Sequence, residues 1–115
     1  MDEFRYNLPY PEMTGGALAI SSHQFAQVNG FSNQFYGWGG EDDEFHRRLA
    51  QHSLPPVRLD PRTARYVSLK HVKQAARSTV DMREIQPDRD GIKTTNSSIW
   101  RIEYKTGHTL LQVYI

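Results

Sequence analysis

The sequence predicts a small domain of mixed α/β class, or a fragment of one, over residues 1–115. The first half carries patterns typical of helices, and short apolar runs typical of strands occur on both sides of them. The length supports the same conclusion, because 115 residues suffice for one domain at most.

Composition narrows the range of partners. The chain is 37% hydrophobic and 23% charged, with a formal net charge of +1, so it has no general attraction for nucleic acid or anionic lipid. It contains no cysteine, which excludes disulfides and thiolate metal sites. No run approaches the roughly 20 apolar residues of a membrane span. We therefore expect no membrane segment in this chain, and either a cytosolic protein or a part of one anchored elsewhere.

The first elements can be assigned in order. Residues 1–13 contain two prolines and are expected to be irregular or extended. Residues 17–20, a short apolar run, are interpreted as a buried strand. Ser21 and Ser22 are good N-caps for a helix over residues 23–28.

The next segment leads to a second helix. Asn29-Gly30 is expected to end the first helix in a left-handed C-cap. Residues 31–40 are rich in aromatics and glycine, and the acidic residues 41–44 then open the second helix, where their charge complements the helix dipole. We expect its buried stripe to consist of Phe45, Leu49 and His52. Arg47 and Arg48 follow where positive charge costs the helix nothing.

The second half is predicted to be strands and one long loop. Pro55-Pro56 stops the second helix. Residues 72–91 are polar and without periodicity, and are interpreted as a long flexible loop with one helical turn. Strands are expected at residues 57–59, 66–69, 99–104 and 109–115, the last two joined near Gly107.

The candidate sugar-binding and catalytic residues lie in one short segment. Trp38 lies between glycines 37, 39 and 40, and three carboxylates follow at once: Glu41, Asp42 and Asp43. An indole can stack on the apolar face of a sugar ring, while carboxylates accept hydrogen bonds from hydroxyl groups or act as a general base. Helix capping and core packing are the alternative, but only one or two acids can profit from a helix end.

The same residues carry a family resemblance. Residues 29–43, NGFSNQFYGWGGEDD, resemble the β-1,4-galactosyltransferase signature NGFxNxxWGWGGEDDD. The resemblance extends upstream through Gly15-Gly16 and Ser21-x-x-Gln24-Phe25. Downstream it runs through Phe45-x-x-Arg48-Leu49 to His71. A weaker similarity follows at Asp90-Gly91-Ile92-x-x-Thr95.

The resemblance implies a fold and an activity. The chain would be the C-terminal catalytic half of a GT-A-like nucleotide-sugar glycosyltransferase. The reaction would be an inverting transfer of galactose or N-acetylgalactosamine from a UDP-sugar to a glycan hydroxyl. A nucleotide-binding region would lie upstream of this chain. The location would be the Golgi lumen for an anchored eukaryotic parent, and the cytoplasm otherwise.

The resemblance also assigns residues. Asp42 matches the catalytic base, and Glu41 and Asp43 match carboxylates that orient the acceptor. Trp38, with Gly39 and Gly40, matches a short loop that moves over donor and acceptor. Two further matches lie outside this segment: Met13 at a position against the donor sugar, and His71 as a manganese ligand.

Some family features are absent. Where the family has a second metal ligand, a methionine three residues before the histidine, this chain has Ser68. The family's Asp-x-Asp motif appears only as Asp88-Arg89-Asp90, which is in the wrong place and is interpreted as a turn. His71 is thus the single candidate ligand for manganese. A non-catalytic carbohydrate-binding module and a plain structural domain stay open as alternatives.

Overall fold

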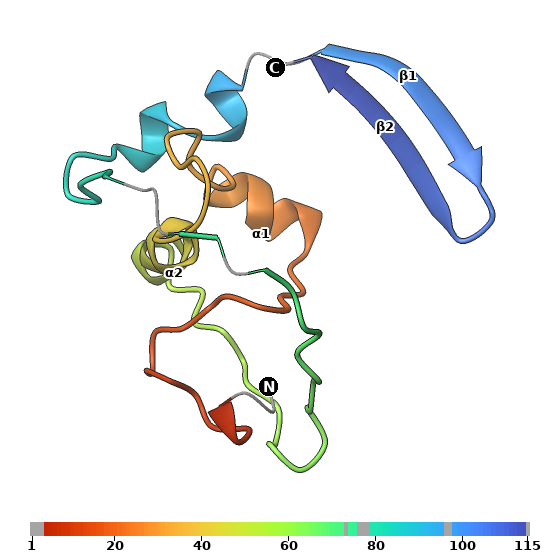
Figure 1. Ribbon diagram of the computed structural model, residues 1–115. Helices are drawn as coiled ribbons and strands as arrows, with labels where there is room; N and C mark the ends of the chain where they lie inside the picture. Colours follow the sequence, from red (N-terminus) through yellow and green to blue (C-terminus); the bar gives the residue numbers. More distant parts are fainter. Residues whose placement is uncertain (1–3, 73, 76–78, 96–97, 115) are drawn as a thin grey trace.

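The computed structural model describes residues 4–72, 74–75, 79–95 and 98–114. Helices, short 3-10 turns and a hairpin of strands make up the fold (Figure 1). In chain order these are α1 (Ser22–Gln27), α2 (Glu41–Gln51), η2 (Pro87–Arg89), η3 (Ile92–Thr94), β1 (Ser98–Lys105) and β2 (His108–Tyr114). The mixed helix and strand content confirms the class predicted from the sequence.

Helix α1 begins and ends as its sequence predicts. The amide N–H of Gln24 donates to Oγ of Ser21 at 3.2 Å, and the Ser21 N–H donates to Oε1 of Gln24 at 3.4 Å. This reciprocal pair is a capping box, which satisfies two amides at the helix start. At the other end, Asn29 and Gly30 both have positive φ, 61° and 64°. The left-handed pair turns the chain sharply toward the glycine-rich segment.

Helix α2 carries the core of the molecule. Phe45 and Leu49 are buried on one face and pack with Val28, which follows α1. The Phe31 ring stacks on Phe45 with centroids 4.1 Å apart. The predicted stripe is confirmed for Phe45 and Leu49, whereas His52 is only half-buried and caps the helix C-terminus.

Three predicted strands are not formed. Residues 17–20, 57–59 and 66–69 have no strand assignment, and the first was also wrongly expected to be buried. Their apolar side chains are largely exposed, with Val57 at 91% and Leu69 at 81%. An apolar run becomes a strand only when a partner supplies the hydrogen-bonded ladder, and none does so within the described residues.

The hairpin at the end of the chain is confirmed. Strands β1 and β2 pair antiparallel from Ser98↔Tyr114 to Lys105↔His108, with an irregularity between Ile99 and Arg101. It extends away from the helices (Figure 1).

Part of the predicted long loop, residues 72–91, can be checked. Residues 73 and 76–78 lie outside the described residues. The described stretch from residue 79 onward is anchored by the buried side chain of Ile85 and contains the turn η2, so the predicted helical turn is present as a 3-10 turn. The prediction that Asp88-Arg89-Asp90 forms a turn is confirmed. Among the described residues, no helix is long and apolar enough to cross a membrane.

Candidate functional site

A small pocket lies at the start of α2. It encloses about 190 Å³ and has Glu41, Asp42 and Phe45 on its helix side. The opposite wall is the segment before α1, which contributes Thr14, Gly15, Gly16 and Leu18. Phe31 completes the lining. We call this the acid pocket. It places a carboxylate pair against an apolar floor.

The local backbone explains why the carboxylates gather here. Gly40 is the N-cap of α2 and has a φ of 86°, a left-handed conformation that favours glycine. The chain can therefore enter the helix directly from the glycine-rich segment. The first helical turn then consists wholly of acidic residues, of which Glu41 and Asp42 reach the acid pocket.

Asp42 is partly buried in the acid pocket. Burial raises the pKa of its carboxyl group, and the neighbouring negative charges of Asp43 and Glu41 raise it further. Gly15 lies so close that a Cβ there would overlap Oδ2 of Asp42. A carboxylate with a raised pKa binds a proton more strongly, which suits a general base.

Asp43 points to a different partner. The hydroxyl of Tyr10 donates to Oδ1 of Asp43 at 2.8 Å. This hydrogen bond is the main cause that raises the pKa of Tyr10 to about 12, with burial and the charge of Asp43 adding to it. The segment before α1 is also tied to α2 one turn further on, where Oγ1 of Thr14 lies 3.0 Å from Nδ1 of His46.

The glycine-rich segment is held by the first carboxylate. The Gly39 N–H donates to Oε2 of Glu41 at 3.1 Å. Trp38, which lies between Gly37 and Gly39, is 61% exposed and does not line the acid pocket. An exposed indole beside a carboxylate pocket has a free face on which a ring can stack.

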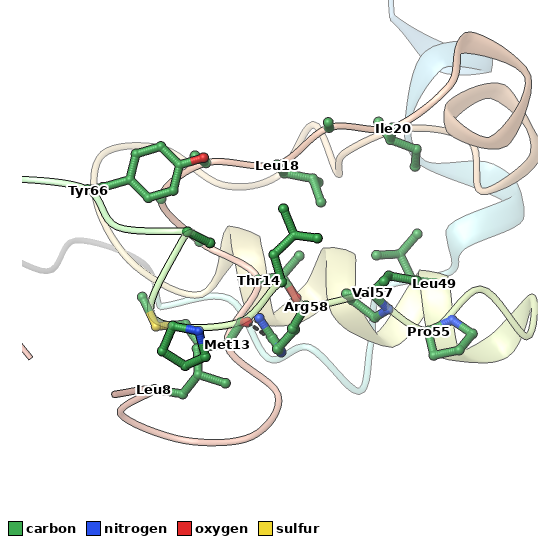
Figure 2. A pocket seen from close by; sticks show the side chains of 18 of the residues that line it. Leu8, Met13, Thr14, Leu18, Ile20, Leu49, Pro55, Val57, Arg58 and Tyr66 are labelled. Carbon is green, nitrogen blue, oxygen red and sulfur yellow. Dashed lines mark hydrogen bonds between the residues drawn. The ribbon is translucent and has the colours of Figure 1, made fainter. Parts of the chain in front are cut away.

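Met13 lies on a second and larger pocket. Figure 2 shows its side chain beside Leu8 and Arg58, in a cavity of about 880 Å³ between the N-terminal segment and residues 53–66. The guanidinium of Arg58 donates to the carbonyl oxygens of Pro11 and Met13 and so fixes one wall. The two pockets share Thr14, Gly15, Gly16 and Leu18, so they adjoin across this segment.

His71 stands apart from both pockets. Its Nδ1 lies 2.8 Å from the carbonyl oxygen of Leu69, and a carbonyl can only accept, so Nδ1 carries the proton. Nε2 is then the nitrogen with a lone pair for a ligand. The described residues contain no group of three or more potential metal-ligating side chains. By themselves they do not fit a manganese ion.

The structure thus brings some predicted residues together and separates others. Glu41 and Asp42 share one pocket and Met13 lines the adjoining one, whereas Asp43 and Trp38 line neither. Sequence reasoning missed Tyr10, whose position gave no signal of its contact with Asp43. It marked Gly15 only through the Gly15-Gly16 pair of the resemblance.

Comparison with known proteins gives a consistent result. Residues 1–72 match a family model described as the N-terminal domain of galactosyltransferase. Beta-1,4-galactosyltransferase 4 of Cricetulus griseus is 34% identical over 98 residues, which cover 85% of this chain and 27% of that protein. Beta-1,4-galactosyltransferase 2 of Mus musculus is 42% identical over 71 residues, which cover 62% of this chain and 19% of that protein.

A shorter match has a higher identity. Beta-1,4-galactosyltransferase 1 of Bos taurus is 52% identical over 50 residues, or 44% of this chain and 12% of that protein. In all three cases the chain spans a small part of the relative, at most 27% of its length.

Proposed function

Because this chain belongs to the galactosyltransferase family, we propose that it supplies the acceptor site and the catalytic base of an inverting sugar transfer. The donor is a UDP-sugar carrying galactose or N-acetylgalactosamine, and the acceptor is a hydroxyl group of a glycan. The matching family model is described as an N-terminal domain. Assignment of this chain to the C-terminal, GT-A-like catalytic half rests on the resemblance of residues 29–43 and is part of the proposal.

The observation that carries this function is the placement of Asp42. Its carboxylate lies in the acid pocket, and burial there raises its pKa. As the acceptor oxygen attacks C1 of the donor sugar, the C1–O bond to UDP breaks and a new C1–O bond forms. The acceptor proton passes to Asp42, which neutralises the oxygen as the bond forms.

The neighbouring residues orient the acceptor. Glu41 lines the same pocket, and Asp43 follows Asp42 in the helix with one oxygen held by Tyr10, so both can accept hydrogen bonds from sugar hydroxyls. Trp38 offers an exposed ring for stacking on the sugar. Its glycine neighbours allow the loop to change shape when ligands bind.

The donor is proposed to bind across the larger pocket. Met13 lines it, and the shared wall of residues 14–16 would bring a sugar there next to Asp42. Met13 at this position leaves both galactose and N-acetylgalactosamine open as the donor sugar. The chain spans at most 27% of the length of the three relatives, and we assign the nucleotide to a part that this chain does not span.

Manganese is proposed to bind at a site to which the described residues contribute only one ligand. His71 would supply one imidazole nitrogen, and the remaining ligands would come from outside the described residues. When bound, the ion would neutralise the leaving diphosphate. A Golgi lumen location is proposed for an anchored eukaryotic parent.

Asp42→Asn in the longest available form of the protein tests the function directly. Loss of the base should lower kcat by about 10²-fold or more with a small change in KM for the acceptor. Asp60→Asn is the matched control, because Asp60 is a surface carboxylate paired with Arg62. Unchanged kcat in Asp42→Asn would contradict the assignment.

A non-catalytic carbohydrate-binding module is the second candidate. It is favoured by the exposed Trp38 together with the lack of a metal-ligating group among the described residues. Titration of this chain with UDP and manganese, and separately with oligosaccharides, distinguishes the two. Binding of UDP that needs manganese supports the transferase, whereas oligosaccharide binding that is indifferent to metal supports the module.

A further inference from the structure

Three charged side chains form a buried cluster: Glu44 and Arg48 of α2, and Asp90 of the segment between η2 and η3, which we call the Asp90 loop. The Glu44 and Arg48 side chains are fully buried, and that of Asp90 is 10% exposed. Nε of Arg48 donates to Oε2 of Glu44 at 2.7 Å, and its Nη2 lies 3.4 Å from Oδ2 of Asp90. Burying such charges costs solvation that pairing only partly offsets, so the cluster is a poor source of stability and a good source of fixed geometry.

The cluster joins α2 to two distant segments. Nη1 of Arg48 donates to the carbonyl oxygens of Asp90 and Gly30, at 2.7 and 3.1 Å. The Asp90 carboxylate in turn accepts from Oγ of Ser32 at 2.5 Å and from the Asn33 N–H at 2.9 Å. The turn after α1, the Asp90 loop and α2 are therefore held together through one guanidinium.

The orientation of α2 about its axis decides which carboxylate lies against Gly15 in the acid pocket, a pocket that Glu41 also lines. Successive helical residues are rotated by roughly 100°, so Glu41, Asp42 and Asp43 point in three directions. Asp42 lies roughly 160° around the helix from Glu44. Holding the Glu44 and Arg48 face against the Asp90 loop thus directs the Asp42 face toward Gly15. A rotation by one residue would bring Glu41 or Asp43 there instead.

We propose that Arg48 is a positioning residue, which selects Asp42 among the three carboxylates by fixing the rotation of α2 through Glu44 and Asp90. Arg48 touches no substrate in this scheme. The proposal rests on the proposed function only in taking Asp42 as the base. The selection itself is a property of the folded chain.

The test uses the complete 115-residue chain and follows the Asp42 carboxyl carbon by NMR as a function of pH. Arg48→Met alone leaves buried carboxylates without their main partner, and is expected to destabilise the fold strongly. Glu44→Leu combined with Arg48→Met removes the two fully buried charges of α2, while Asp90 keeps its bonds to Ser32 and Asn33. This double variant should remain folded.

In the folded double variant, we expect the Asp42 pKa to fall toward the ordinary value of an aspartate, because the carboxylate is no longer held in the pocket. Arg62→Met, which removes an exposed arginine, should leave the Asp42 titration unchanged. An unchanged Asp42 titration in the double variant would overturn the positioning role. Failure of Asp42→Asn to lower turnover would instead contradict the proposed function and leave this result intact.

Discussion

Gly15 lies against the carboxylate of Asp42, at a distance where any Cβ on residue 15 would overlap Oδ2. The obstructing atom is the end of a rotatable side chain, so Gly15→Ala should displace the carboxylate and leave the backbone in place. We expect a stability change within about 0.5 kcal/mol, as for other surface substitutions. The Asp42 pKa should fall as its burial decreases, and NMR titration of the carboxyl carbon measures it. A large loss of stability with an unchanged pKa would contradict this account.

The hydrogen bond from Tyr10 to Asp43 should contribute weakly to stability, because it is exposed to solvent. Tyr10→Phe is expected to cost no more than about 0.5 kcal/mol. The pKa of Tyr10 is raised to about 12, so the contribution is present below the ordinary tyrosine pKa and is lost as pH rises toward 12. Urea denaturation at neutral pH and above pH 10 measures it.

Tyr36→Phe is the matched control for this prediction, because Tyr36 is 78% exposed. Its stability should equal that of the unchanged chain at both pH values. In an absorbance titration, Tyr10→Phe should remove the ionisation step at highest pH. Persistence of that step would assign it to another tyrosine.

Asp42→Asn should stabilise this chain slightly at neutral pH. The folded-state pKa of Asp42 is raised, so the folded chain binds more protons than the unfolded chain between the two pKa values. The charged Asp42 therefore reduces stability as pH rises through that window. We expect a gain of under about 0.5 kcal/mol at pH 7, since the group is partly solvated, and none below the ordinary aspartate pKa. Thermal unfolding at both pH values measures it, and a loss at pH 7 would show that Asp42 stabilises the fold.

Much of the fold follows from signals that are local in the sequence. Ser21, one of the two predicted N-caps, caps α1, and Phe45 and Leu49 lie at helical spacing on the buried face of α2. Gly107 turns the hairpin with a φ of 84°. Each signal depends on residues a few positions apart, so a single sequence suffices to find it.

The rest depends on contacts between distant residues. The run at 57–59 has a strand composition, yet strand pairing needs a partner that local pattern does not specify. The burial of Arg48 had no local signal, because Asp90 lies 42 positions away in the chain and beside it in space. The carboxylates of the candidate site were predicted from their motif, whereas the selection of Asp42 by its surroundings required the structure.

Gly91 provides the sharpest test of the link between the Asp90 loop and α1. Its φ is 144°, and a Cβ there would overlap the carbonyl oxygen of Asn29, which accepts from the Ile92 N–H at 2.9 Å. Backbone strain and a clash with backbone act together, so Gly91→Ala should cost about 3 kcal/mol or more. Urea denaturation measures the loss.

Gly107→Ala separates the clash from the strain. Gly107 also has a positive φ, 84°, but nothing lies within 4 Å of a Cβ placed there. We expect Gly107→Ala to lower the free energy of unfolding by only about 1–2 kcal/mol, because alanine is strained in the left-handed conformation. If both variants lose the same stability, the close approach of Gly91 to Asn29 does not hold the Asp90 loop. A larger loss for Gly91→Ala, accompanied by a lower Asp42 pKa, would show that this contact also supports the orientation of α2.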